Sequence, residues 1–183
     1  MAHFPGFQKK FPKPDSCQPM SKSLEEYQGR LPGSLIEFLS EQGACSYAKG
    51  LIWTMDPFFM QDTLEEWLDE PENAVPFART AFGELFLWQE GAAYYLNVQR
   101  GAVTKVISSV EKFFDGFLLD ENIQKKVFRK SLFAKALKEY GPISADEVYA
   151  LTPALALGGA ERVENLRKTK LREYVSFLAG LVE

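Results

Sequence analysis

Apolar residues first recur at helical spacing near residue 31. The positions are Leu31, Leu35, Ile36 and Leu39. This spacing places them on one face of a helix. Pro32 falls in the first turn and Gly43 just beyond the last apolar position, where those residue types are favoured. The pattern predicts an amphipathic helix that packs on the core.

The next segment combines a short apolar run with a second helical pattern. Residues 50–55 form a short, mostly apolar run, as expected of a strand. Pro57 then opens a predicted helix in which Leu64, Trp67 and Leu68 face inward. We expect the acidic residues of this helix to face water.

Between residues 80 and 108 the pattern changes to that of strands. Residues 82–89, 92–98 and 102–107 are apolar or β-branched runs, and the dipeptides Glu90-Gly91 and Arg100-Gly101 separate them. Turns this short join neighbouring antiparallel strands. The segment therefore predicts a three-stranded meander.

Helical patterns dominate the rest of the chain. The apolar stripes are Ile107, Val110, Phe113, Phe114, Phe117 and Leu118; then Ile123, Val127, Phe128, Leu132, Ala136 and Leu137; and last Leu171, Tyr174, Val175, Leu178 and Val182. Each is about one helix face wide. Ser144 and Glu147 have the spacing of a capping box, which predicts a short helix through Tyr149.

These elements predict an α+β fold with an N-terminal helical lobe, a central antiparallel β meander and C-terminal helices packed on the sheet. We divide the chain into an N-terminal extension (1–21), a first lobe (22–76) and a C-terminal domain (77–183), the last two sharing one globule. A chain of 183 residues with 46% hydrophobic content supports one packed core of this size.

The negative charge is concentrated in one segment. Residues 50–78 contain no Lys or Arg. Their acidic residues are Asp56, Asp62, Glu65, Glu66, Asp69, Glu70 and Glu72. The rest of the chain carries a net positive charge, since the whole has a formal charge of −4. Such a segment offers a basic partner a defined surface and repels nucleic acid.

Residues of this segment are the candidates for partner binding. They are Asp56, Phe58, Phe59, Asp62, Glu65, Glu66, Asp69 and Glu70. Residues three or four apart share a helix face, so some of these carboxylates would form one acidic stripe. Adjacent aromatics on a helix point in different directions, which leaves one available to a partner. The alternative is a stripe that only solvates the helix.

The sequence favours no catalytic, metal or cofactor site. His3 is the sole histidine and falls in a segment expected to be mobile, whereas a general base must be held rigidly. Cys17 and Cys45 form no C-x-x-C pair. We expect Cys45 to serve as a small buried hydrophobe and the protein to reside in a reducing cytoplasm. No signal peptide and no run long enough for a membrane span is seen.

Two glycine-rich or basic segments have simple structural interpretations. Gly158-Gly159 lacks the flanking residues of a phosphate-binding loop and is interpreted as a turn. A basic helix face is expected around residue 127, formed by Lys125, Lys126, Arg129 and Lys130. It has no aromatic platform on which bases could stack, so nucleic-acid binding is not predicted.

Several strings in fixed order resemble a known bacterial family. In the first block they are Tyr27-Gln-Gly-Arg-Leu-Pro32, Gly50-Leu-Ile-Trp53, Pro57 and Glu66-Trp-Leu68. In the second they are Arg79-Thr-Ala-Phe-Gly83, Leu85-Phe-Leu-Trp88, Gly141, Asp146-Glu-Val-Tyr149 and Pro153-Ala-Leu-Ala-Leu-Gly-Gly159. Together they resemble a GAD-related domain followed by the C-terminal domain of type VI secretion immunity proteins that protect against a DNase toxin. The resemblance covers roughly residues 22 to 182.

The resemblance implies an immunity protein, or antitoxin, of the bacterial cytoplasm. It would act without catalysis, binding a cognate toxin, such as a basic nuclease domain, and occluding it. The resemblance carries over no contact residues, because the family's contacts do not form a fixed motif. A non-catalytic sensor of peptides or small ligands is the alternative, and it would require an apolar pocket with converging polar groups.

Overall fold

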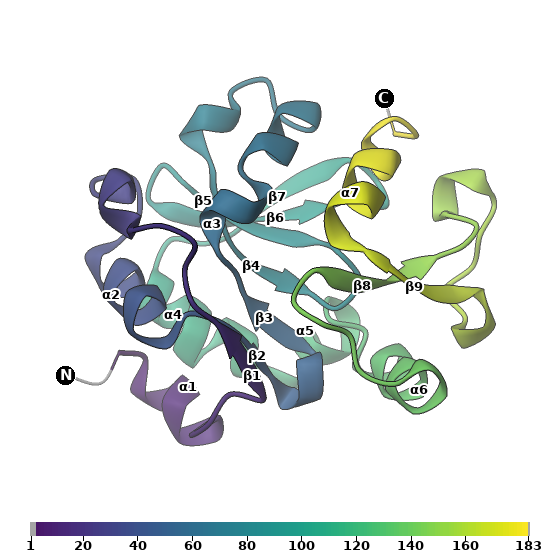
Figure 1. Ribbon diagram of the computed structural model, residues 1–183, viewed down its shortest axis with the longest axis horizontal. Helices are drawn as coiled ribbons and strands as arrows, with labels where there is room; N and C mark the ends of the chain where they lie inside the picture. The colour runs from purple at the N-terminus through teal and green to yellow at the C-terminus, as the bar shows by residue number, and fades with distance from the viewer. Residues whose placement is uncertain (1–2, 183) are drawn as a thin grey trace.

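A seven-stranded antiparallel sheet forms the centre of the protein in the computed structural model, which describes residues 3–182 (Figure 1). Each strand pairs with the next one along the chain, so the order in the sheet is β1 to β7. The strands are β1 (Ser16–Gln18), β2 (Ala44–Tyr47), β3 (Ile52–Thr54), β4 (Val75–Thr80), β5 (Leu85–Gln89), β6 (Ala92–Asn97) and β7 (Ala102–Ile107). A second, two-stranded sheet pairs β8 (Glu147–Leu151) with β9 (Leu166–Lys170).

Helices occupy both ends of the chain, so the predicted α+β class is confirmed. They are α1 (Pro5–Lys10), α2 (Gly33–Gln42), α3 (Pro57–Met60), α4 (Val110–Asp115), α5 (Glu121–Lys126), α6 (Lys130–Tyr140) and α7 (Leu171–Ala179). Short 3₁₀ helices lie between several of these elements. Within residues 3–182 no helix combines the length and the apolar character that a bilayer span requires.

Both faces of the large sheet are covered, and β5 shows how the sequence achieves this. Phe86 and Trp88 point into the core that α1, α2, α4 and α6 close. Leu85 and Leu87 point into a second core with α3, α7 and β8. Alternate residues of a strand face opposite sides. All four positions are therefore apolar, because each buried side chain contributes about 1.5–3 kcal/mol.

The N-terminal segment contributes directly to the first core. Phe7 is fully buried, and the rings of Phe4 and Phe114 stack with 4.2 Å between their centroids. His3 Nε2 lies 3.5 Å from a carboxylate oxygen of Glu37 and 3.8 Å from one of Glu41, both on α2. The expectation that His3 lies in a mobile segment is wrong, because the adjacent phenylalanines anchor the chain.

The two cysteines are joined by a disulfide in this structure. Cys17 and Cys45 stand directly opposite each other in the β1–β2 pair, with 4.1 Å between their Cα atoms. The expectation for Cys45 is thus wrong in one respect: the side chain is buried but bonded. Gly43 allows this close pairing, since its φ is +86° and a Cβ there would meet the Gln18 carbonyl oxygen.

The helix predicted to follow Pro57 ends after one turn. Asp56 caps α3 by accepting a hydrogen bond from the backbone N–H of Phe58, and α3 ends at Met60. A 3₁₀ helix, Asp62–Glu66, follows. The Gln61 side-chain amide donates to the carbonyls of Pro71 and Ala74, which folds the later residues back towards α3. These tertiary contacts replace the continuous helix.

The capping-box pattern at Ser144 belongs to a strand. The Glu147 carboxylate accepts a hydrogen bond from the Ser144 backbone N–H, which is one half of a capping box, and another from the Ser144 hydroxyl. The chain nevertheless continues as β8, where Tyr149 pairs with Lys168 of β9 and donates its N–H to Ala81. The side-chain contact forms locally, and pairing with a distant strand decides the backbone conformation.

Of the remaining predicted elements, those with a clear local sequence pattern are confirmed. The helix at residues 31–39 and the meander at 82–107 are confirmed as α2 and β5 to β7. Strands β1, β2, β4 and β9 were not predicted. The boundary drawn between residues 76 and 77 falls inside β4, whose six residues are all buried.

Candidate functional site

The predicted partner-binding residues lie around the segment between α3 and β4 (Figure 1). The structure divides them into residues that hold this segment in place and residues that remain available. Asp56 belongs to the first group, because its carboxylate accepts from the backbone N–H groups of Ser21 and Phe58. Phe58 also packs inward, with its ring centroid 5.0 Å from that of Tyr27.

Three more of these residues contact α7. Asp62 forms an ion pair with Arg172, with 2.6 Å between Oδ2 and Nη2. Glu66 accepts a hydrogen bond of 2.8 Å from the Ser176 hydroxyl. The Arg172 guanidinium lies 5.7 Å from the centroid of the Phe59 ring. Asp62 and Glu66 therefore attach the segment to the C-terminal helix.

Four exposed carboxylates remain, and we call Glu65, Asp69, Glu70 and Glu72 the acidic surface. Within residues 3–182 none of them has a cationic side-chain nitrogen within 4.0 Å. Lys22 and Arg30 lie at its edge, where they line a shallow depression together with Glu65 and Glu72. Three of the six predicted carboxylates, Glu65, Asp69 and Glu70, thus belong to the acidic surface, and Glu72 joins them.

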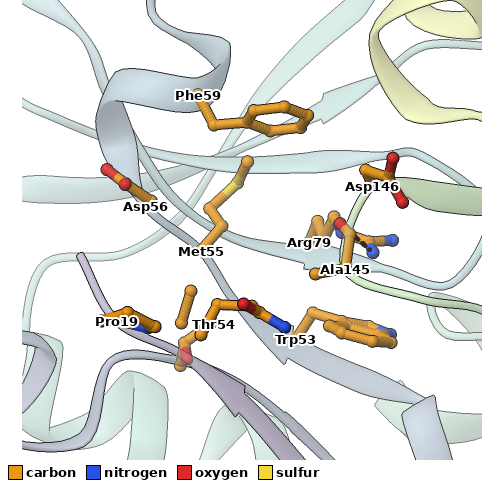
Figure 2. Close-up of a pocket in the computed structure, with 11 residues that line it drawn as sticks. Pro19, Trp53, Thr54, Met55, Asp56, Phe59, Arg79, Ala145 and Asp146 are labelled. Carbon is orange, nitrogen blue, oxygen red and sulfur yellow. Dashed lines mark hydrogen bonds between the residues drawn. The ribbon is translucent and has the colours of Figure 1, made fainter. Parts of the chain in front are cut away.

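A second candidate site lies between the large sheet and the loop before β8. A partly open cavity of about 160 Å³ is bounded by β3, the start of α3, β4 and that loop (Figure 2). Its lining residues are Gln18, Pro19, Ala44, Trp53, Thr54, Met55, Asp56, Phe59, Arg79, Ala145 and Asp146. Most of the wall is apolar, with Phe59 and Met55 on one side and Trp53 on the other (Figure 2).

Arg79 is the unusual residue of this cavity. Its side chain is 1% exposed and its guanidinium lies 4.4 Å from the centroid of the Trp53 ring. Nη1 donates to the Thr80 carbonyl at 3.1 Å and Nη2 to the Ala145 carbonyl at 3.0 Å. No carboxylate of residues 3–182 lies within 4.0 Å of it. Burial lowers the pKa of Arg79 to about 9, because the charged form is deprived of water.

The two carboxylates at the cavity are already engaged by donors. Asp146 Oδ2 lies 2.5 Å from Lys170 Nζ, and its other oxygen accepts from the Ser144 hydroxyl. The hydrogen bond from Lys170 lowers the pKa of Asp146. Asp56 is held by the backbone N–H groups described above. Arg79 is therefore a buried cation that no side-chain carboxylate of residues 3–182 contacts within 4.0 Å, and Asp146 acts on it only through the longer-range attraction of its charge.

The patterns in the sequence did not predict this cavity. Trp53, Arg79 and Asp146 each belong to a different string that carries the family resemblance, and the fold brings the three strings together. One signal was available: Arg79 is a lone cation in the otherwise uncharged segment 75–80, which forms a buried strand. Within residues 3–182 no group of three His, Cys, Asp or Glu side chains is placed to hold a metal ion.

Comparisons with known proteins define the class of the chain. Residues 3–101 match the family described as GAD-like domain, and residues 108–182 match the family described as T6SS immunity protein Tdi1, C-terminal. The chain belongs to the GAD-like domain family, and residues 108–182 are similar to the C-terminal domain of T6SS immunity protein Tdi1.

A solved structure has the same fold. The crystal structure of Atu4351 from Agrobacterium tumefaciens is similar to this chain with a TM-score of 0.81 and 20% sequence identity. The similarity covers 96% of this chain and 88% of that one. A comparison with curated proteins gives no match.

Proposed function

We propose that this protein is an immunity protein that binds and neutralises a cognate type VI secretion toxin by occluding it. The observation that carries the proposal is the match of residues 108–182 to the C-terminal domain of T6SS immunity protein Tdi1. The protein acts by binding and not by catalysis. Its only histidine, His3, lies against the carboxylates of Glu37 and Glu41, within the packing of α2.

The acidic surface supplies the recognition in this proposal. A toxin that cleaves nucleic acid needs a basic cleft for phosphates, and a cluster of exposed carboxylates would compete for that cleft. Glu65, Asp69 and Glu70 are exposed to water before binding. The free-energy cost of desolvating them therefore arises only when the partner binds. Long-range attraction would mainly raise the association rate and would weaken as salt screens it.

The cytoplasm is the proposed place of action. There a resident immunity protein meets a toxin that has been delivered or produced in the same cell. A disulfide is unusual in that compartment, since its thiol pools keep cysteines reduced. The redox state of Cys17 and Cys45 in cells therefore tests this part of the proposal.

Binding to a toxin encoded beside the gene, in an inactivated form, tests the mechanism. The variant E65K/D69K reverses two unpaired charges of the acidic surface. The control E139K/E164K makes the same change in net charge at two exposed glutamates outside this segment. We expect E65K/D69K to weaken binding by more than about tenfold at low salt, mostly through the association rate. The control should stay within about twofold of the parent.

Two results would contradict the proposal at different levels. Equal loss in both double variants would show that net charge matters and the acidic surface does not. Failure of the unmodified protein to bind any neighbouring toxin, or to protect cells that produce it, would remove the immunity function itself.

A further inference from the structure

We propose that the cavity around Arg79 is a binding site for a small aromatic monocarboxylate, such as benzoate. The site lies apart from the acidic surface and goes beyond the proposed toxin binding. Three independent properties of the cavity support it: its size, the character of its walls and the state of its buried cation.

The size fits one six-membered ring. The cavity volume is about 160 Å³. Apolar cavities of about 150 Å³ in other proteins bind benzene. A larger polycyclic ligand would require the walls to move, and a ligand without a ring would leave much of the apolar wall uncovered.

The walls suit a flat apolar body. Phe59 and Met55 face the interior from one side and Trp53 from the other (Figure 2). Met55 and Trp53 are 4% and 3% exposed, so the surrounding core fixes their positions. The indole N–H of Trp53 donates to the Gly50 carbonyl at 2.8 Å, which holds the ring in one orientation. A preformed apolar slot loses little side-chain entropy when a ring enters.

Arg79 explains why the ligand carries a carboxylate. The guanidinium donates to the carbonyls of Thr80 and Ala145 and lies over the Trp53 ring. Those partners carry partial charges only. Asp146 acts on Arg79 through its negative charge from beyond 4.0 Å, so no carboxylate of residues 3–182 contacts the guanidinium directly. An incoming carboxylate would form charge-assisted hydrogen bonds with Arg79, which are stronger than neutral ones. Arg79 is already desolvated in the folded protein, so ligand binding does not add the free-energy cost of burying the cation.

Asp56 and Asp146 restrict the ligand to a single negative charge. Both residues line the cavity, and their charges disfavour a second anionic group in it. Asp146 is partly compensated by Lys170 and Asp56 by backbone donors, so neither captures Arg79. A phosphate or dicarboxylate would meet this repulsion, whereas the single carboxylate of benzoate would lie at Arg79 with its ring outward along the slot.

Ligand-observed fluorine NMR with 4-fluorobenzoate on the intact protein tests the proposal. We expect a Kd of about 1 mM or tighter, which is reasonable for a ligand of this size. Fluorobenzene lacks the carboxylate and 4-fluorobenzylamine reverses the charge, so each should bind at least about tenfold more weakly.

Substitution of two alanines by methionine tests whether the ligand binds in the cavity or elsewhere on the surface. A145M places a longer side chain at the cavity wall and should reduce binding of 4-fluorobenzoate at least about tenfold by filling the space. A134M makes the same change at an exposed position on α6 and should leave binding unchanged. The variant R79Q, if folded by circular dichroism, should bind 4-fluorobenzoate and fluorobenzene equally.

The following outcomes would overturn the proposal. One is the absence of a 4-fluorobenzoate signal change at concentrations on the order of ten times the expected Kd. Another is binding by A145M equal to that of A134M. A third is equal binding of fluorobenzene and 4-fluorobenzoate to the unmodified protein. The toxin-binding variant E65K/D69K should bind 4-fluorobenzoate normally, so the two proposals succeed or fail separately.

Discussion

Glu84 and Arg129 form a buried ion pair between the two family-matched parts of the chain. Glu84 follows β4 and is fully buried, and its Oε1 lies 2.5 Å from Arg129 Nη1. Arg129 also bonds to Glu161 at 2.8 Å, and Glu84 accepts from the Thr80 hydroxyl. The basic face expected around residue 127 therefore loses Arg129, which turns inward. The pair joins the GAD-like part to the Tdi1-like part.

Removing one charge of this pair should destabilise the fold strongly. The variant E84Q leaves the Arg129 side chain, which is 13% exposed, with only the more exposed Glu161 as a carboxylate partner. We expect the free energy of unfolding to fall by about 3–5 kcal/mol, as for other broken buried pairs. Urea denaturation followed by circular dichroism measures this.

A matched variant distinguishes burial from simple loss of an ion pair. D146N removes the exposed pair with Lys170, which should cost less than about 1 kcal/mol. The double variant E84Q/R129M should be more stable than E84Q, because Arg129 is no longer buried without the Glu84 carboxylate. If the free energy of unfolding of E84Q falls by less than about 1 kcal/mol, the conclusion that this buried ion pair stabilises the fold is contradicted.

Buried tyrosines should limit stability in alkali. Burial raises the pKa of Tyr27, Tyr47 and Tyr149 from 10.0 to about 12. A pKa that is higher in the folded state stabilises the protein below the unfolded pKa, and this contribution is lost as pH rises through the folded pKa. We therefore expect the free energy of unfolding to fall between about pH 10 and about pH 12.

Tyr47 offers a specific control for this alkaline effect. It is 3% exposed, and desolvation alone raises its pKa. In Y47F the loss of stability above about pH 10 should be smaller by about 1 kcal/mol per pH unit. Urea denaturation at several pH values, with tyrosinate absorbance as a second probe, measures the difference. An identical alkaline slope for Y47F and the parent would refute the contribution of Tyr47.

The disulfide should stabilise the sheet edge by restricting the unfolded chain. Cys17 and Cys45 are separated by 28 positions, and closing a loop of this length is worth about 3.5 kcal/mol in the chain-entropy account. The double variant C17S/C45S should unfold more easily by about this amount, and a reductant should destabilise only the parent. Thermal unfolding with and without reductant tests this. If alkylation before reduction labels both cysteines of the purified protein, the pair is not oxidised.

Local patterns in the sequence were sufficient for several elements. Leu35 and Leu39 mark α2 because helical spacing itself places them on one buried face. Strands β5, β6 and β7 follow from apolar runs and two-residue turns, which need only neighbouring strands. The acidic character of residues 50–78 was also evident, because net charge requires no structure.

Tertiary structure alone decided the features that depend on distant partners. Ser144 and Glu147 make the contact of a capping box, yet pairing with β9 makes the segment a strand. Asp62 is acidic in the sequence, but only the position of Arg172 removes it from the available charge. Arg79 gains its significance from Trp53 and from the loop before β8. Local periodicity is fixed by neighbouring residues, whereas ion pairs, strand pairing and cavities depend on which distant segments the folded chain brings into contact.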